Sequence, residues 1–351
     1  MRHKLREWTP AAPPSHPAMK SLLLLLTVLV GLQVVAQAAP PDAFEQNHRL
    51  GRGVNIIGYD PLWRSRDQAR FQAKHFRLLK EAGFQSVRVN LHPFRHMEQT
   101  NGWALRPAWL ETLDWTVAQA SAQGLLVILD FHEFNAMADK PDSRKAQFLA
   151  FWKQLAAHCR NAPDSVLFEI LNEPNKGLTP ALWNQYLREA LAIIRETNPT
   201  RTVVVGPAFW NSVDHLAELE LPAADPHLIV TVHYYKPMDF THQGAPWSTA
   251  KDKSGIAWGT EAERQTVRDT FAKVTAWAKE HRRPIFLGEF GAYDKAPLES
   301  RTRYTDFVAR TAEAAGWSWA YWQFDSDFIL WDMQRDAWVE PILKALVPPK
   351  K

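Results

Sequence analysis

Cysteine is almost absent from this sequence. Cys159 is the single cysteine among 351 residues, so the chain cannot form an internal disulfide and its stability must come from packing. An excess of charge of one sign is also lacking, because 41 lysines and arginines oppose 38 acidic residues and leave a net charge of +3. A nucleic-acid-binding surface is therefore not expected. With 46% hydrophobic residues, the chain can still bury a large core.

Long hydrophobic runs are lacking too, apart from one near the N-terminus. The run from Leu22 to Val30 follows Lys20 and precedes Ala36-Gln37-Ala38, which fits a small-x-small cleavage site. Because the run is short for a membrane span, we interpret residues 1–38 as a signal peptide, with Met19 as an alternative start, rather than as a retained anchor. The mature chain is then expected to be secreted or periplasmic, without a membrane span.

Linkers, low-complexity segments and phosphate-binding loops are missing after Ala39, and strand-like and helix-like segments alternate instead. Apolar runs predict strands at residues 51–57, 84–90, 125–131, 166–171, 202–205, 227–235, 284–290 and 317–324. Helical periodicity predicts helices at residues 67–82, 107–123, 143–160, 180–197, 261–281 and 298–315. This alternation favours an α/β fold, a single closed (β/α)8 TIM barrel over residues 39–351, rather than a doubly wound sheet.

The fourth predicted strand ends abruptly in polar residues. Residues 166–171 are apolar except for Glu169, as in a parallel strand that is covered on both faces, and Asn172-Glu173-Pro174 follows directly. Pro174 cannot continue the hydrogen-bonded ladder. Taken alone, this stretch could be an ordinary strand-to-loop junction with a solvated glutamate.

Other polar and aromatic side chains also stand at predicted strand ends, where the active sites of such barrels form. They are Asn55, Arg88, Asn90, His132, Glu133, Asn172, Glu173, Trp210, Asn211, His233, Tyr235, Glu289 and Trp322. Glu173 and Glu289 would face one cleft. The irregular segment 236–259 carries Trp247 and could cover a substrate or pack against the barrel rim.

Two carboxyl groups that converge at one cleft are what the hydrolysis of a glycosidic bond requires. One carboxyl stays protonated and donates to the leaving oxygen, while the other attacks the anomeric carbon directly or activates water. A separation of roughly 5 Å predicts retention of configuration and one nearer 8 Å predicts inversion. Arg88 needs a buried acceptor, for which Glu289 is the candidate, and Arg88 and Tyr235 would favour the ionised form of a carboxylate nucleophile.

These motifs resemble glycoside hydrolase family 5, the cellulase-type retaining glycosidases, over the whole mature chain. The residues that carry the resemblance are Arg88 in Val-Arg-Val-Asn, His132 in Asp-Phe-His-Glu, Asn172-Glu173-Pro174, His233-Tyr234-Tyr235, Glu289 in Gly-Glu-Phe-Gly, and Trp322. The segment from Tyr234 through Trp247 resembles that of bacterial members that act on β-1,4-glucans, some of which also act on mixed-linkage glucan or mannan.

The resemblance implies a role for each matching residue. Glu173 would be the acid/base and Glu289 the nucleophile, with His233 and Tyr235 assisting them, and Trp322 would lie under the sugar being cleaved. Asn172 would bind the 2-hydroxyl of that sugar, while Asn55, Trp210 and Trp247 are further candidates for binding or support. The family often has two adjacent histidines where this chain has His132-Glu133, which puts the sugar contacts near His132 in doubt.

The sequence therefore predicts an endo-β-1,4-glucanase that cleaves internal bonds of a β-linked polysaccharide with retention. A β-mannanase or mixed-linkage glucanase, a non-catalytic carbohydrate-binding barrel and a metal-dependent deacetylase or amidohydrolase are the alternatives. A metal site is not expected, because His92, His96, His132 and His233 do not follow a zinc-binding spacing. No cofactor is expected, and the protein is expected to be a monomer.

Overall fold

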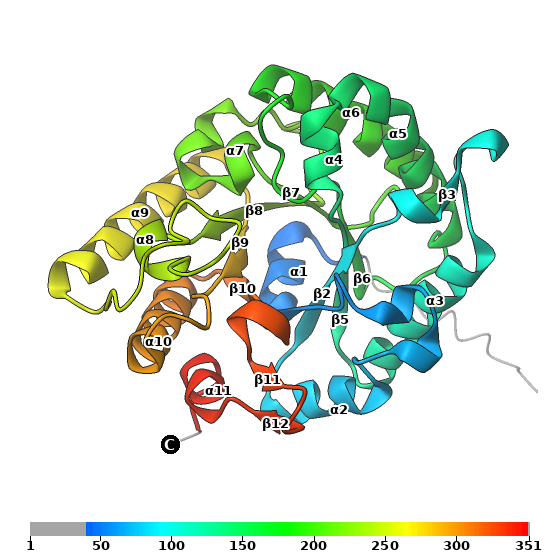
Figure 1. Cartoon of the computed structure of the whole chain (residues 1–351). Helices are drawn as coiled ribbons and strands as arrows, with labels where there is room; N and C mark the ends of the chain where they lie inside the picture. Colours follow the sequence, from blue (N-terminus) through cyan, green and yellow to red (C-terminus); the bar gives the residue numbers. More distant parts are fainter. Residues whose placement is uncertain (1–39, 350–351) are drawn as a thin grey trace, which may run out of the picture. The chain divides into compact units, whose positions relative to one another are not determined.

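The computed structural model describes residues 40–349, which fold around a closed barrel of eight parallel strands (Figure 1). The strands are β1 (Arg52–Ile56), β2 (Ser86–Leu91), β5 (Leu126–Phe131), β6 (Val166–Glu169), β7 (Val203–Val205), β8 (Leu228–Tyr234), β9 (Ile285–Phe290) and β10 (Ser318–Tyr321). They follow one another around the ring in this order, and β10 pairs with β1. The predicted (β/α)8 barrel is confirmed, whereas the predicted signal peptide lies outside the described residues.

The main helices surround the strands, as Figure 1 shows. They are α2 (Ala73–Ala82), α3 (Pro107–Ala122), α5 (Pro141–His158), α6 (Pro180–Thr197), α9 (Glu261–His281) and α10 (Leu298–Ala314). The prediction of a helix from residue 67 was wrong at its start. The Asp60 carboxylate accepts the backbone N–H groups of Arg70 (3.2 Å) and Phe71 (2.9 Å), which holds this segment outside the helix. None of the helices within residues 40–349 has both the length and the apolar composition needed to cross a membrane.

A short helix that the sequence analysis did not predict closes one end of the barrel. Helix α1 (Ala43–Leu50) begins at Asp42, whose side chain accepts the N–H of Glu45, and Figure 1 shows the helix inside the ring of strands. Ala43 and Leu50 pack with Leu126, Ile128, Leu167, Val204, Ile229, Phe286 and Ala320. These side chains form an apolar layer inside the barrel, so polar chemistry is confined to the layers above it.

Side chains alternate between the outer and inner faces of each strand, and the inward-facing ones become polar toward the end of the barrel opposite this layer. In β2, Val87 and Val89 belong to the outer core beneath the helices, whereas Ser86, Arg88 and Asn90 lie on the other face. In β5, Asp130 follows Ile128 on the inner face, and His132 continues the same series beyond the strand. The barrel interior is thus apolar near α1 and charged toward the carboxyl ends of the strands.

The remaining elements are short. They are two small hairpins, formed by β3 (Met97–Glu98) with β4 (Ala104–Leu105) and by β11 (Trp331–Asp332) with β12 (Ala337–Trp338), and four helices, α4 (Phe134–Asp139), α7 (Ala208–Asn211), α8 (Met238–Thr241) and α11 (Glu340–Leu346). Within segment 236–259, the side chain of Gln243 donates to the carbonyls of Phe240 and Ile256 and accepts the N–H of Ile256. Trp258 is buried against the rim, while Trp247 is 58% exposed, so the segment both packs and presents an aromatic ring.

Candidate active site

A buried guanidinium group organises the polar end of the barrel. Arg88 is fully buried, and its five N–H groups donate to the two oxygens of Glu169 (2.7 and 2.8 Å), to Glu289 (2.8 Å) and to the amide oxygens of Asn55 and Asn172 (both 2.8 Å). The predicted contact between Arg88 and Glu289 is therefore present. Because an arginine has five donors in a fixed fork, this set leaves no freedom in its position.

Glu173 and Glu289 come together above Arg88. One oxygen of each carboxyl group and a ring nitrogen of His233 lie within 4.8 Å of one another. Although such a trio could hold a cation, the oxygens of Glu289 already accept hydrogen bonds from Arg88 (2.8 Å) and from the Tyr235 hydroxyl (2.9 Å). The arrangement suits proton transfer and nucleophilic attack by carboxyl groups better than it suits metal binding.

The carboxyl groups outnumber the cations in this buried site. Arg88 faces Asp130, Glu169 and Glu289, and Glu173 lies close by. Burial, opposed by Arg88 and reinforced by the charges of Asp130 and Glu169, raises the pKa of Glu173 to about 8. Burial also raises the pKa of Glu289 to about 7, with His233 and Arg88 acting to lower it. The order agrees with the hydrogen bonds, since two donors support the ionised form of Glu289.

His233 is placed to serve either protonation state of Glu173. Its Nδ1 lies 2.7 Å from Glu173 and its Nε2 lies 3.2 Å from the side-chain amide of Asn211. Burial lowers the pKa of His233, so the ring is neutral and has one donor and one acceptor nitrogen. It can accept a hydrogen bond from protonated Glu173 or donate one to ionised Glu173, depending on the tautomer.

His132 and Trp322 form the floor beside the carboxyl pair. The His132 ring stacks on the Trp322 indole at 5.6 Å with an interplanar angle of 8°, and its Nδ1 lies 2.6 Å from Asp130. Trp322 is half-buried and precedes a cis peptide bond. The adjacent Glu133 turns away, because its carboxylate accepts the backbone N–H of Phe94 at 2.8 Å.

The other aromatic candidates are exposed. Trp210 is 45% exposed and lies in the short element α7 after β7, where its backbone N–H donates to the carbonyl of Pro174 at 3.1 Å. Phe209, Trp210 and Asn211 all have left-handed backbone conformations with positive φ, and strain of this kind collects at functional sites. Trp247 stands edge-on to Tyr293, at 5.2 Å. Asn55, by contrast, is fully buried and supports Arg88 instead of facing the cleft.

The sequence analysis did not include Asp130 and Glu169 among the candidates, although both anchor the site. Glu169 is a polar exception inside an apolar strand, and Asp130 is its neighbour at the matching position of β5. Their spacing along the strands could have identified them. Each side chain faces the inside of the barrel, beside the inward-facing polar residue of the neighbouring strand. A fully buried charge in a barrel strand requires a partner, and Arg88 is that partner.

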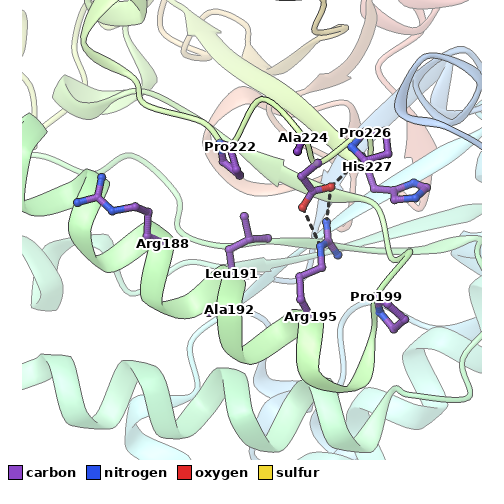
Figure 2. A pocket seen from close by; sticks show the side chains of 10 residues that line it. Arg188, Leu191, Ala192, Arg195, Pro199, Pro222, Ala224, Pro226 and His227 are labelled. Carbon is purple, nitrogen blue, oxygen red and sulfur yellow. Dashed lines mark hydrogen bonds and ion pairs between the residues drawn. The ribbon is translucent and has the colours of Figure 1, made fainter.

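A separate surface pocket of about 560 Å³ lies between α6 and the segment that precedes β8 (Figure 2). It is near the amino ends of the strands, whereas the carboxyl pair lies at their carboxyl ends. Its charged lining is already paired, since Arg195 binds Asp225 at 2.8 Å and Arg188 binds Glu220 at 2.8 Å. This pocket therefore offers no chemistry comparable with that of the carboxyl site.

Comparisons with known proteins agree with this geometry. A family model described as cellulase (glycosyl hydrolase family 5) matches residues 49–327. Endoglucanase H of Acetivibrio thermocellus is 29% identical over 319 residues, which make up 88% of this chain and 34% of that protein. The chain thus spans about a third of the length of that relative.

A similar solved structure is that of Thermotoga maritima Cel5A in complex with mannotriose, with 36% identity and a TM-score of 0.83. The match covers 87% of this chain and 100% of that one. A structure of the same Thermotoga protein in complex with cellobiose matches with the same identity, TM-score and coverage.

Proposed function

The chain belongs to the cellulase family, glycosyl hydrolase family 5, and from this premise we propose that it is an endo-β-1,4-glucanase that retains anomeric configuration. The observation that carries the proposal is the pair Glu173 and Glu289, whose oxygens lie within 4.8 Å. Retaining glycosidases hold their carboxyl groups roughly 5 Å apart, because no water has to fit between the nucleophile and the sugar.

The first chemical step uses both carboxyl groups. A carboxylate oxygen of Glu289 attacks the anomeric carbon while Glu173 gives its proton to the glycosidic oxygen, so the sugar–oxygen bond breaks and a glycosyl-enzyme ester forms. Tyr235 and Arg88 hold the two oxygens of Glu289, which orients the attacking lone pair. Trp322 supports the sugar ring, and the amide of Asn172 binds its 2-hydroxyl.

The second step returns the enzyme to its starting state. Ionised Glu173 now takes a proton from a water molecule while the water oxygen bonds to the anomeric carbon. The ester bond breaks, so Glu289 leaves as a carboxylate and the sugar carries the new hydroxyl group. His233 accommodates both forms of Glu173 through its contact at 2.7 Å. Two inversions give net retention. The chemistry uses carboxyl groups throughout and calls for no metal or cofactor.

The substrate class is tested by comparing polymers. Reducing-sugar release per enzyme should be greater from carboxymethylcellulose, the β-1,4-glucan, than from barley mixed-linkage glucan or glucomannan. NMR spectra of the reaction should show β-configured products first. A preference for glucomannan would favour a β-mannanase, the second candidate, which the mannotriose complex of the similar Thermotoga structure supports. Initial α-configured products would exclude the retaining mechanism.

The pH dependence of hydrolysis should be bell-shaped. The working form has ionised Glu289 and protonated Glu173, so kcat/KM should fall below a pH of about 7 as Glu289 gains a proton and above about 8 as Glu173 loses one. In Tyr235→Phe the ionised form of Glu289 loses a donor, and the acid limb should move to higher pH. Rates on soluble cello-oligosaccharides measure this, and an alkaline limb that moved instead would contradict the two roles.

We further propose that the catalytic domain comprises residues 39–351, that it acts as a monomer and that it works outside the cytoplasm, either secreted or periplasmic. Support comes from the leader-like composition of residues 1–38 and from the substrate, because a β-linked polysaccharide is too large to reach an enzyme inside the cell. Endoglucanase H, one of the similar proteins, comes from the bacterium Acetivibrio thermocellus.

A further inference from the structure

Asn211 is a buried polar residue to which the proposed mechanism gives no role. It follows Phe209 and Trp210 in α7, and the three residues have positive φ angles of 56°, 61° and 53°. Such left-handed conformations are costly for residues other than glycine, so the surrounding structure must hold this turn in place. Directly after the turn, Ser212 forms an isolated parallel bridge with His233 of β8. The turn therefore brings the fully buried side chain of Asn211 beside His233.

Two glycines allow the backbone to close around this group of side chains. A Cβ at Gly206, after β7, would stand 2.3 Å from Oδ1 of Asn211 and 3.0 Å from the methyl carbon of Thr231. A Cβ at Gly288, in β9, would stand 2.5 Å from the hydroxyl oxygen of Thr231 and 3.0 Å from Nε2 of His233. Close packing on both sides leaves the Asn211 amide little room to move.

The orientation of the Asn211 amide follows from what lies on each side of it. Its Nδ2 lies 3.2 Å from Nε2 of His233, whereas its Oδ1 is buried and has no hydrogen-bond partner within residues 40–349. The reverse orientation would leave an NH2 group, with two donors, in the place of Oδ1. Buried donors without a partner are rarer in proteins than underused carbonyl oxygens. The amide therefore donates, and Nε2 of His233 accepts.

The direction of this hydrogen bond decides where His233 carries its proton. Burial lowers the pKa of His233, and a neutral ring that accepts at Nε2 carries its proton at Nδ1. Nδ1 lies 2.7 Å from Oε1 of Glu173 and 3.6 Å from Oε2 of Glu289, so the Nδ1–H group donates to Glu173. When Glu173 is protonated, its carbonyl oxygen is the better acceptor for this bond. The proton then resides on the other oxygen of Glu173.

We propose that Asn211 is a positioning residue for acid catalysis, which fixes His233 as the Nδ1–H tautomer and so keeps the proton of Glu173 on the oxygen that is free to reach the glycosidic oxygen. The inference deepens the proposed glucanase function and rests on it. With its proton on Nε2, His233 would accept the Glu173 proton at Nδ1, and this proton would point away from the substrate. Acid catalysis would weaken, while the attack by Glu289 would remain.

Asn211→Asp tests the proposal, because aspartate has nearly the same size and also tolerates the left-handed conformation. Its carboxylate accepts a proton on Nε2 of His233. Nδ1 then accepts the Glu173 proton or, in a cationic ring, pairs with ionised Glu173, and both outcomes withdraw the acid proton from the substrate. We expect kcat/KM to fall about 10- to 100-fold for phenyl β-cellobioside. It should change less than about threefold for the dinitrophenyl analogue, whose leaving group departs without a proton.

Two further variants separate this role from a structural one. Asn211→Leu removes the donor without adding a charge and should show the same selective loss, of about three- to tenfold. Thr231→Val is the matched control, because it removes a fully buried hydroxyl group beside the same ring that has no hydrogen-bond partner within residues 40–349. This control should leave kcat/KM unchanged on both substrates. An equal loss on both substrates in the two Asn211 variants, or no loss on either, would overturn the proposal.

The tautomer of His233 can also be measured without turnover, by nitrogen NMR of protein that carries isotope-labelled histidine, with His233→Gln to identify the signals. The wild-type protein should carry the proton on Nδ1 with a bare Nε2, and Asn211→Asp should carry one on Nε2. A wild-type ring protonated on Nε2 alone would overturn the proposal. If the wild-type protein cleaves no polysaccharide but the tautomer depends on Asn211, the glucanase assignment fails and the control of His233 stands. If cleavage is normal and the tautomer is the same in both proteins, the positioning role is wrong.

Discussion

Glutamine in place of Glu289 is expected to lower kcat on carboxymethylcellulose by about 10⁴-fold or more, because the neutral amide cannot form the ester intermediate. The fold should survive this change. Arg88 keeps its two bonds to Glu169 (2.7 and 2.8 Å) and its contact with Asp130 (3.1 Å), so its charge stays compensated. Circular dichroism and the melting temperature should therefore match the wild type while reducing-sugar release disappears.

Glu173→Ala should differ from Glu289→Ala in a way that identifies each role. Loss of the acid should affect polysaccharides strongly but spare substrates with acidic leaving groups, which depart without a proton. Added azide should then attack the glycosyl-enzyme of Glu173→Ala and give the β-glycosyl azide. In Glu289→Ala, azide can occupy the vacated side and displace the leaving group once, giving the α-glycosyl azide. The same azide anomer from both variants, or full activity in either, would contradict the assignment.

The sequence was sufficient for the strands because parallel barrel strands are buried on both faces and read as apolar runs. It was insufficient for α1, whose stretch Glu45-Gln46-Asn47-His48-Arg49 has the composition of a solvated segment. Gln46 and Asn47 are nevertheless buried, and Asn47 bonds to Ser318 at 2.6 Å. Contacts with a strand more than 250 residues away are not visible in local periodicity.

The site was predictable in part for a related reason. Glu173 and Glu289 stand at strand ends, where topology alone brings them to one face. Their shared environment depends on Asp130 and Glu169, which lie within strands and were masked by their apolar neighbours.

The buried network also supports the proposed division of labour, in which two residues of the same type act as acid and nucleophile. One guanidinium cannot compensate several carboxylates, so the network favours retaining a proton. Glu289 has direct bonds from Arg88 and Tyr235, whereas Glu173 contacts neutral His233. The proton therefore resides preferentially on Glu173, whose pKa is raised to about 8.

Arg88→Met is expected to destabilise the fold by about 3–5 kcal/mol, because it leaves buried carboxylates without their cation. Arg88 lowers the pKa values of Asp130, Glu169, Glu173 and Glu289, so its loss should raise all four. The folded protein would then hold more protons than the unfolded chain, and its stability would fall as pH rises. The deficit, measured by urea unfolding, should be larger at pH 8 than at pH 5.

The matched control for this prediction is Arg77→Met. Arg77 is 53% exposed and pairs with Glu81 at 2.8 Å on the surface of α2, so its removal should cost no more than about 1 kcal/mol. Arg88→Lys keeps the charge but loses the planar fork of donors. The pH dependence of its stability should therefore be closer to that of the wild type than its activity is, since a lysine cannot bind Glu169 through two parallel bonds and still reach Glu289. A deficit in Arg88→Met that did not depend on pH would mean that lost packing, rather than uncompensated charge, is what destabilises the barrel.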